Sequence, residues 1–368
     1  MSDSRLHELS ALGQSVWIDF LSREMIETGG LERLMREDAV VGVTSNPTIF
    51  QKAISEGDLY DEQIRACLEE TDDPKEIFWR LAETDVGNAC DLLRSVWDAG
   101  GGKDGYVSIE VDPNLAGDTE ATIAEARRLH EQIDKPNLFV KIPATKAGLP
   151  AIEEMIASGK SINVTLIFSL ERYSEVAEAY VRGLERLVES GGDPSRVASV
   201  ASFFVSRVDT ETDKRLDEIG GHDDLKGKLA VANAKLAYQR YKEIFSGPRW
   251  DALATQGATA QRCLWASTST KNPDYSDVLY VEELIGPETV NTMPEETIEA
   301  FQDHGEVALT LERGVDEANA LFDRLAEVGI DYEDVTRVLE EEGVQKFSDS
   351  FSELLDGIKA KRGELAAA

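Results

Sequence analysis

The sequence is short of cysteine and of positive charge, and it has no long apolar run. Only three of its 368 residues are cysteines, Cys67, Cys90 and Cys263. Their odd number and wide spacing argue against a disulfide framework and favour reduced thiols. The apolar stretches have the length of strands, and no basic N-terminal start leads into an apolar segment. We therefore expect neither a membrane span nor a signal peptide, and a cytoplasmic protein.

The deficit of positive charge makes the chain strongly acidic. It has 71 Asp and Glu residues against 38 Lys and Arg residues, which gives a formal net charge of −33 at pH 7. Nucleic acids and anionic membranes bind to basic surfaces, so we expect neither of them as a partner. Hydrophobic residues make up 42% of the chain, enough for a large buried core.

Motifs for metals and common cofactors are also missing. The four histidines, His7, His130, His222 and His304, fall in helical or loop segments rather than at strand ends. Neither a histidine metal site nor a Ser-His-Asp triad is predicted. No GxGxxG follows a strand and no GxxxxGK[ST] occurs, so binding of dinucleotides or ATP has no support. We expect no metal and no cofactor.

Eight segments have the composition of buried parallel strands, because each is a short run rich in Val, Ile and Phe without clean alternation. They are residues 15–20, 39–44, 105–111, 137–143, 161–169, 197–207, 261–268 and, more weakly, 277–286. Helical patterns lie between them. In one of these, Ile123, Ala126, Leu129 and Ile133 recur at helical spacing. The order along the chain is strand then helix, repeated.

This order predicts an α/β fold, a closed (β/α)8 TIM barrel, with an open doubly wound sheet as the alternative. Two stretches exceed a single crossover. We expect residues 51–104 to be a helical insertion and residues 287–363 a helical C-terminal region without a strand. No linker or low-complexity block divides the chain, so residues 1–368 are predicted to form a single domain. The roles of both stretches and the oligomeric state, including a homo-oligomer, stay open.

Polar residues gather near the C-terminal ends of the strand candidates. A charged residue in a buried strand is costly, so a site at the barrel mouth explains it better than packing does. Residues of this kind belong to the first seven strand candidates and the turns after them: Asp19, Asn46, Glu110, Lys141, Asn163, Thr165, Ser202, Arg207, Ser267 and Lys271. We expect these side chains to converge on one face.

Taken singly, most of these residues also have a purely structural interpretation. Asp19 and Asn46 are more simply read as helix caps or turn residues, and Glu110 as a solvated loop acid. Lys141 is different. The segment LFVKIP places its amine inside an apolar run, where lysine is seldom buried without a function.

A buried amine of this kind can do carbonyl chemistry. A desolvated lysine can lose its proton at neutral pH and attack a carbonyl, and the resulting Schiff base is an electron sink for cleavage of a C–C bond. Proton transfer then needs carboxyl groups, which Asp19 and Glu110 supply. Thr165 can position a water between Glu110 and the imine of Lys141.

Five motifs occur in a fixed order: GVTSNPTIF, VSIEVDPNL, LFVKIPATKAG, INVTLIFS and WASTSTKNPDY. With them the sequence resembles the transaldolases, from WIDF to about WASTSTKNP. The resemblance implies a (β/α)8 barrel in which the fourth strand carries the Schiff-base lysine, and LFVKIPAT places that lysine at Lys141.

The resemblance also implies roles for the other polar residues. Asp19 is implied as the general acid and base, and Glu110 and Thr165 as partners of a catalytic water. Asn46 and Asn163 are implied to hold substrate hydroxyls.

A phosphate site is implied as well, at Ser202, Arg207 and the WASTSTK segment. This chain departs from many relatives, which have an arginine just after the seventh-strand serine. Here residues 267–270 read Ser, Thr, Ser, Thr before Lys271, so we expect Lys271 to supply the second positive charge, with Ser267 beside it.

The implied reaction moves a dihydroxyacetone unit from sedoheptulose 7-phosphate or fructose 6-phosphate to glyceraldehyde 3-phosphate or erythrose 4-phosphate. It belongs to the non-oxidative branch of the pentose phosphate pathway and needs no cofactor. Small-molecule sugar phosphates are the expected partners.

Three other functions stay open at this point. The closest is a class I fructose 6-phosphate aldolase that uses the same lysine. Phe204 resembles the transferase side, because related aldolases tend to carry a tyrosine near that position. A barrel that binds sugar phosphates without chemistry and a metal-dependent lyase or isomerase are the others.

Overall fold

The computed structural model describes residues 4–55 and 57–367. Eight parallel strands close into a barrel in sequence order, and the last strand pairs with the first. The strands are β1 (Gln14–Ile18), β2 (Val40–Val43), β3 (Tyr106–Glu110), β4 (Leu138–Pro143), β5 (Ile162–Ile167), β6 (Ser199–Phe204), β7 (Arg262–Ala266) and β8 (Thr289–Met293). The closed barrel confirms the predicted fold class and excludes the open sheet.

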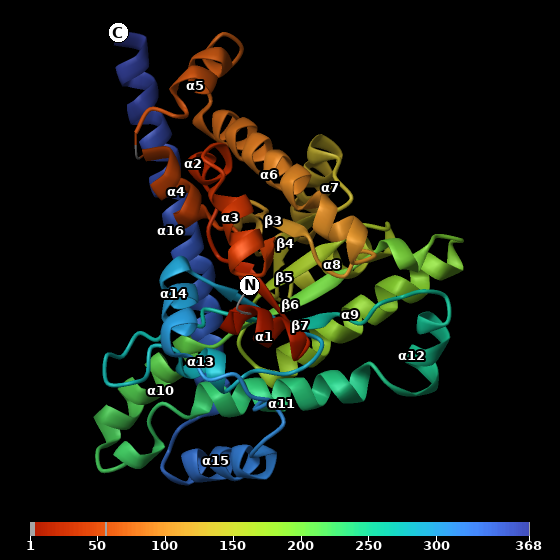
Figure 1. Cartoon of the computed structure of the whole chain (residues 1–368), viewed down its shortest axis with the longest axis vertical. Helices are drawn as coiled ribbons and strands as arrows, with labels where there is room; N and C mark the ends of the chain where they lie inside the picture. The colour runs from red at the N-terminus through yellow and green to blue at the C-terminus, as the bar shows by residue number, and fades with distance from the viewer. Residues whose placement is uncertain (1–3, 56, 368) are drawn as a thin grey trace.

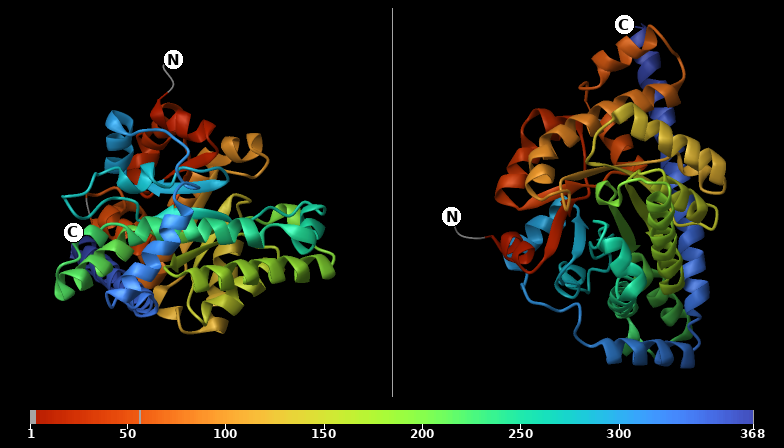
Figure 2. Two further views of the ribbon diagram at one scale, coloured as in Figure 1. Left: turned by 90° about the horizontal axis from the view of Figure 1, so that it is seen from below. Right: turned by 90° about the vertical axis from the view of Figure 1, so that its right-hand side faces the viewer.

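Helices surround the barrel on its outside (Figure 1, Figure 2). The α-helices are α1 (Arg5–Ala11), α2 (Arg23–Glu27), α3 (Gly30–Glu37), α4 (Pro47–Ser55), α5 (Asp61–Leu68), α6 (Pro74–Ala99), α7 (Thr119–Ile133), α8 (Gly148–Ala157), α9 (Leu170–Glu189), α10 (Ser206–Ile219), α11 (Leu229–Ile244), α12 (Gly247–Ala254), α13 (Leu279–Glu282), α14 (Glu295–His304), α15 (Val315–Glu327) and α16 (Tyr332–Ala367). Short 3-10 helices are η1 (Pro113–Leu115), η2 (Pro194–Arg196) and η3 (Asp223–Leu225).

The first seven strands lie where the sequence places them, but the eighth does not. The weakest strand candidate, residues 277–286, contains the short helix α13 instead. Strand β8 lies further on, inside the region 287–363 that was expected to be helical and free of strands. Both predictions are therefore wrong at this point.

The physical reason is that β8 buries polar side chains that have partners inside the protein. Gln14 Nε2 donates to Thr289 Oγ1 at 3.0 Å, and Thr268 Oγ1 donates to Asn291 Oδ1 at 2.8 Å. Such a strand, TVNTM, lacks the apolar run that marks the others. The candidate segment reads as apolar because α13 buries residues such as Tyr280 against the barrel.

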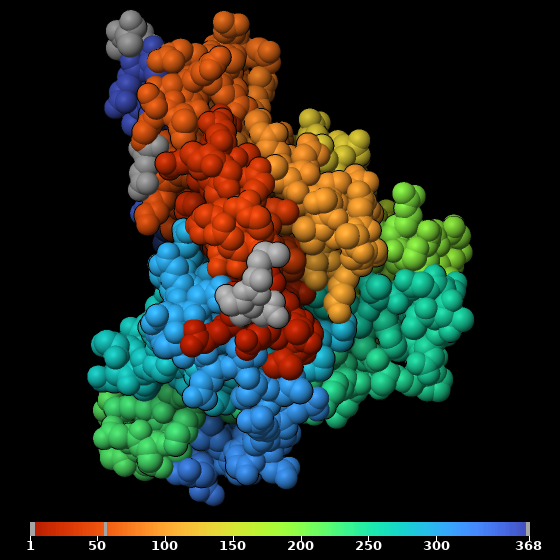
Figure 3. All heavy atoms as spheres, viewed as in Figure 1, coloured from red at the N-terminus to blue at the C-terminus, as the bar shows by residue number. Residues whose placement is uncertain are grey.

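The two long stretches outside the regular pattern pack on each other. Residues 51–104 hold the end of α4 and the helices α5 and α6. Helix α16 runs along one side of the molecule beside α4 and contacts α4, α5, α6 and β5 (Figure 1). In the space-filling view, α5 and the end of α16 form one end of the molecule together (Figure 3).

An aromatic cluster joins the insertion to the C-terminal helix. Phe50 of α4, Phe78 and Trp79 of α6 and Phe351 of α16 are all buried. The ring centroids of Phe78 and Phe351 lie 5.4 Å apart, and those of Phe50 and Phe78 lie 5.7 Å apart, both edge to face. Each such pair adds about 0.5–1.5 kcal/mol beyond the burial of area.

The lower part of the barrel is packed with aromatic rings. Trp17, Tyr106 and Phe139 are buried, and the rings of Tyr106 and Phe139 stack with centroids 4.0 Å apart. Side chains alternate along a strand, so the residue two positions after Trp17 or Phe139 points to the same side. Those residues are Asp19 and Lys141. The packed floor thus lies directly below the polar upper layer.

The cysteines agree with expectation, since all three are free and buried. None of the helices in the described part of the chain combines the length and apolar character that crossing a bilayer requires.

Candidate active site

The candidate site is built on three neighbouring strands in register. Glu110 of β3 pairs with Lys141 of β4, and Lys141 pairs with Asn163 of β5. Lys141 Nζ lies 3.1 Å from Glu110 Oε2 and donates a hydrogen bond of 2.9 Å to the carbonyl oxygen of Ser45. The side chains of Lys141 and Glu110 are only 6% and 4% exposed, so the amine and the carboxyl form a buried ion pair.

The aromatic cluster keeps water away from Glu110. Behind this carboxyl lies a gap of only about 10 Å³, whose walls include Phe50, Phe78, Trp79 and Phe351. Burial raises the pKa of Glu110 above its ordinary value, and the neighbouring Lys141 offsets part of this effect. Side chains of the insertion and of the C-terminal helix are thus part of the surroundings in which this carboxyl is buried.

Asp19 stands at the end of β1 and is held by a chain of hydroxyls. Thr44 Oγ1 donates to Asp19 Oδ1 at 2.6 Å, and Thr292 Oγ1 lies 2.7 Å from Thr44 Oγ1. Thr44 has a single hydroxyl proton, which goes to Asp19, so Thr292 must be the donor to Thr44. Burial raises the pKa of Asp19, while the bond from Thr44 and the charge of Lys141 lower it in part.

A cavity of about 210 Å³ opens at the C-terminal ends of the strands. Most of the predicted site residues line it, as expected for side chains that converge on one face: Asp19, Asn46, Lys141, Thr165, Ser202, Phe204, Arg207, Ser267 and Lys271. Glu110 and Asn163 do not line it. They are buried beside Lys141, behind the cavity wall.

Asn163 is fully buried and fixed on both sides. Its carbonyl oxygen accepts a hydrogen bond of 2.7 Å from the Ser202 hydroxyl, and its amide nitrogen donates to Ser108 Oγ at 3.1 Å. Ser202 thus uses its hydroxyl to orient Asn163, although it also lines the cavity.

Thr165 has a hydroxyl group that is free to form hydrogen bonds. Its Oγ1 is buried and has no hydrogen-bond partner among the described residues. The next residue, Leu166, has a φ of 59°, and the register between β5 and β6 shifts here. Such bulges bend a strand and re-aim its side chains next to active sites. The hydroxyl of Thr165 is available for a ligand or a water.

Asn46 combines a structural role with its place at the cavity. Its Oδ1 accepts a hydrogen bond of 3.1 Å from the backbone N–H of Ile49, in the first turn of α4. The capping interpretation of Asn46 is therefore correct, and the same residue lines the cavity.

Two cations stand at the rim of the cavity. Arg207 is the second residue of α10, directly after β6, and its guanidinium carbon lies 5.2 Å from the centroid of the Phe204 ring. Arg207 Nη1 is buried without a hydrogen-bond partner among the described residues, and burial lowers the pKa of Arg207. Lys271 follows β7, is exposed, and donates to Ser269 Oγ at 2.7 Å. Ser267 Oγ lies 2.9 Å from Ser206 Oγ.

Sequence reasoning missed several residues of the cavity wall. Thr44 lies inside a motif that was recognised, GVTSNPTIF, and its position there could have marked it, whereas Ser269 belongs to the WASTSTK segment already assigned to the phosphate site. Thr292, Glu296 and Phe347 come from the region where no strand was expected. The ring centroid of Phe347, on α16, lies 5.9 Å from Lys141 Nζ.

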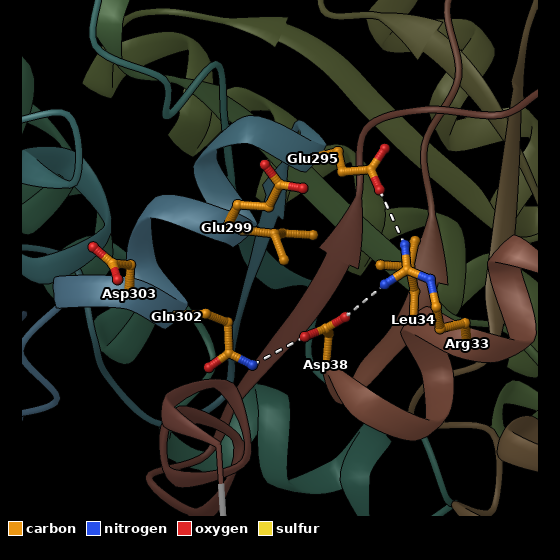
Figure 4. A pocket seen from close by; sticks show the side chains of 8 residues that line it. Arg33, Leu34, Asp38, Glu295, Glu299, Gln302 and Asp303 are labelled. Atoms are coloured by element: carbon orange, nitrogen blue, oxygen red, sulfur yellow. Dashed lines mark hydrogen bonds and ion pairs between the residues drawn. The ribbon is translucent and has the colours of Figure 1, made fainter.

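Another hollow, of about 360 Å³, lies between α3 and α14, and the charge of its lining differs from that of the candidate site. Its lining includes Asp38, Glu295, Glu299 and Asp303 but only one cation, Arg33, which is paired with Glu295 and Asp38 (Figure 4). This acidic surface does not suit an anionic ligand. In residues 4–55 and 57–367, no group of three or more His, Cys, Asp or Glu side chains is arranged to hold a metal ion.

Known proteins of one family resemble this chain over nearly its whole length. A family model described as transaldolase/fructose-6-phosphate aldolase matches residues 16–358. A protein named transaldolase from Frankia alni is 55% identical over 361 residues, which cover 97% of both chains. Transaldolases from Acidothermus cellulolyticus and Mycolicibacterium paratuberculosis are 57% and 54% identical, over 95% and 97% of this chain and 94% and 97% of their own. The chain therefore belongs to the transaldolase/fructose-6-phosphate aldolase family.

Proposed function

We propose that this chain carries out the transaldolase reaction through a Schiff base on Lys141. The chain is a transaldolase, an enzyme that transfers ketose fragments, since relatives of that name align with it over nearly its full length. One observation supports Lys141 as the nucleophile. Its amine is buried at the cavity floor, 3.1 Å from a carboxyl that can take its proton.

The first half of the reaction forms the imine. The Lys141 ammonium first gives a proton to Glu110, and the free amine then adds to the keto carbon of the donor sugar. A proton moves from the new C–N nitrogen to the former keto oxygen, which gives the carbinolamine. The carbinolamine then loses its hydroxyl as water, with Glu110 as the proton donor. The unpartnered hydroxyl of Thr165 holds this water next to the imine. A raised pKa suits Glu110 for taking and returning a proton near neutral pH.

The second half cleaves and reforms a C–C bond. Asp19 takes the proton of the C4 hydroxyl, the C3–C4 bond breaks, and its electron pair moves to the iminium to give an enamine. The aldose product leaves and an aldose phosphate acceptor enters. The enamine attacks the acceptor carbonyl, and Asp19 returns its proton to the new hydroxyl. Hydrolysis of the imine releases the product and frees Lys141.

The substrates in this proposal are sugar phosphates, such as sedoheptulose 7-phosphate or fructose 6-phosphate as donors. Arg207 and Lys271 bind the phosphate, and the unpaired Nη1 of Arg207 supports this role. Asn46 lines the cavity and holds substrate hydroxyls directly, whereas Asn163 acts on them through Ser202, whose hydroxyl it fixes at the cavity wall. We also propose that residues 1–368 form one domain, because the insertion and α16 pack on the barrel, and that the enzyme is cytoplasmic.

The aldolase alternative is less well supported. Phe204 packs against Phe168 with ring centroids 5.3 Å apart and offers no hydroxyl to the enamine. Without such a group, a water that would protonate the enamine lacks a partner there. The three-carbon fragment then stays bound to Lys141 as the enamine until an acceptor sugar binds.

The test is transfer from fructose 6-phosphate to erythrose 4-phosphate, followed through both products. Lys141→Met should lose transfer. The matched control is Lys235→Met, because Lys235 of α11 is another buried lysine. Its amine is paired with the Glu283 carboxylate at 2.8 Å. Full activity in a folded Lys141→Met protein would show that the nucleophile lies elsewhere.

A further inference from the structure

Helix α10, which carries Arg207, also carries two carboxylates that hydrogen-bond to other segments of the chain. Asp209 and Asp213 lie one turn apart on this helix, and Arg207 is in its first turn. Asp209 is buried, and its two oxygens have different partners. Oδ2 accepts a hydrogen bond of 2.8 Å from the Tyr280 hydroxyl, and Oδ1 accepts one of 2.7 Å from the backbone N–H of Ala230.

Asp213 repeats this arrangement one turn later. Its Oδ2 accepts a hydrogen bond of 2.6 Å from the Tyr275 hydroxyl, and its Oδ1 accepts one of 2.9 Å from the backbone N–H of Gly227. A Cβ added to Gly227 would lie 2.7 Å from Cζ of Tyr275, and the φ of Gly227 is 67°. Only glycine allows the backbone to pass so close to the ring.

These contacts connect the two cations of the cavity rim. Arg207 stands on α10, whereas Lys271 stands in the loop between β7 and α13. Tyr275 belongs to the same loop, four residues after Lys271. The loop is closed around both residues, because Thr270 Oγ1 donates to the carbonyl oxygen of Ser276 at 2.8 Å. A bond from Tyr275 to α10 therefore restrains Lys271 relative to Arg207.

We propose that Asp209, Asp213, Tyr275 and Tyr280, here called the α10 latch, are positioning residues that set the spacing of Lys271 from Arg207 and so the affinity for a phosphate group. This inference rests on the proposed function in one respect, that Arg207 and Lys271 bind substrate phosphate. The latch residues touch neither the reacting carbons nor Lys141, and none of them lines the cavity.

The latch acts through the entropy of the loop. Lys271 is exposed and sits on an irregular segment, so an unrestrained loop would have to be ordered each time a phosphate binds. With the latch intact, this ordering is completed during folding. Loss of the latch weakens phosphate binding, and the chemistry at Lys141 stays the same.

The test uses Tyr275→Phe, which removes one hydroxyl and keeps the ring. The control is Tyr180→Phe. The Tyr180 hydroxyl donates to the carbonyl oxygen of Thr259 at 2.8 Å, and Thr259 precedes β7, so this bond lies at the opposite end of the strand from Lys271. The measurements are the Kd of inorganic phosphate, and kcat and KM for fructose 6-phosphate and for unphosphorylated fructose.

For Tyr275→Phe we expect the phosphate Kd and the KM for fructose 6-phosphate to rise about threefold to tenfold, the effect of one lost hydrogen bond. The kcat should stay within about twofold, and the kinetics with fructose should not change. Tyr180→Phe should behave like wild type in all of them. A general structural defect would instead lower kcat and act equally on both sugars.

A double-mutant cycle with Lys271→Ala completes the test. If the latch works through Lys271, Tyr275→Phe has little further effect on phosphate binding once Lys271 is removed. An unchanged phosphate Kd in Tyr275→Phe, or the same loss in the Lys271→Ala background, overturns the latch. If Arg207→Ala and Lys271→Ala themselves leave the phosphate Kd unchanged, the phosphate assignment fails and the latch with it. If those two variants weaken binding and Tyr275→Phe does not, only the latch is wrong.

Discussion

Lys141 and Glu110 face each other across the register of β3 and β4, with Nζ and Oε2 3.1 Å apart inside the barrel. An ion pair at such depth is poor evidence of stability, because removing two charges from water costs several kcal/mol for each ion. An apolar pair would serve the fold as well. The pair is better explained by the reaction, in which a proton moves between these two groups.

The carboxylates give the first prediction. Asp19→Asn and Glu110→Gln should each lower kcat for transfer by about 10² to 10⁴-fold, the usual contribution of a general acid or base. The control is Asp118→Asn, since Asp118 caps α7 through the backbone N–H of Ala121 and lies outside the cavity lining. Near-normal turnover in both site variants would reduce these acids to structural residues.

A second prediction concerns pH. Burial raises the pKa of Glu110, and Glu110 must be deprotonated to accept the lysine proton, so kcat/KM should fall as pH decreases through this raised value. Phe351→Ala opens the aromatic wall beside Glu110 and admits water. The pKa should then move back toward 4.5, and the acid limb of the pH profile should shift to lower pH.

The measurement is kcat/KM for fructose 6-phosphate between about pH 4 and 8, which reports ionisations of the free enzyme. Phe245→Ala, in the aromatic packing around Trp250, is the control for loss of a large ring. If the acid limb lay at the same pH in Phe351→Ala and in wild type, the aromatic cluster would not control the pKa of Glu110.

The third prediction tests the choice between transfer and aldol cleavage. Phe204→Tyr adds a hydroxyl at the cavity wall, where it can hold a water near the enamine. Release of free dihydroxyacetone from fructose 6-phosphate should rise relative to transfer. The ratio of the two products, measured with and without erythrose 4-phosphate, decides the matter, and an unchanged ratio would remove Phe204 as the reason for transfer.

The fourth prediction follows from the conflict between a chain of net charge −33 and anionic substrates. Local positive charge must offset the global repulsion at the barrel mouth. Arg207→Ala should weaken kcat/KM for fructose 6-phosphate by roughly 2 to 4 kcal/mol, and Lys271→Ala by less, because a guanidinium binds phosphate in a bidentate manner. Fructose should be used equally well by all three proteins. Equal losses on both sugars would assign the two cations to the fold or the chemistry.

Much of the barrel could be read from the sequence because its strands follow a simple rule. Strands β1 to β7 are mostly apolar, and each either carries a polar residue in its C-terminal half or is followed by one within the next turn. That residue faces the cavity or lies beside it, as Lys141 and Glu110 do. Strand β8 breaks the rule, because Thr289 and Asn291 are satisfied by side chains from distant parts of the chain. No local pattern contains those partners.

The rest of the site was hidden for a similar reason. Phe347 reaches Lys141 from α16, which is separated from β8 by the two helices α14 and α15, and nothing in its own segment marks it. The position of Phe351 beside the buried Glu110 likewise depends on how α16 packs against α4 and α6. Motifs report residues close to the strands, whereas these contacts depend on the tertiary fold.

The most direct test of the central claim is to trap the intermediate. Wild-type protein is incubated with fructose 6-phosphate and borohydride, digested, and analysed by mass spectrometry, with Lys141→Ala and Lys235→Met treated in parallel. We predict a reduced three-carbon adduct on the peptide that contains Lys141, in wild type and Lys235→Met, and no adduct in Lys141→Ala. An adduct on another lysine, or trapping that persists in a folded Lys141→Ala protein, would contradict the assignment of Lys141 as the Schiff-base residue.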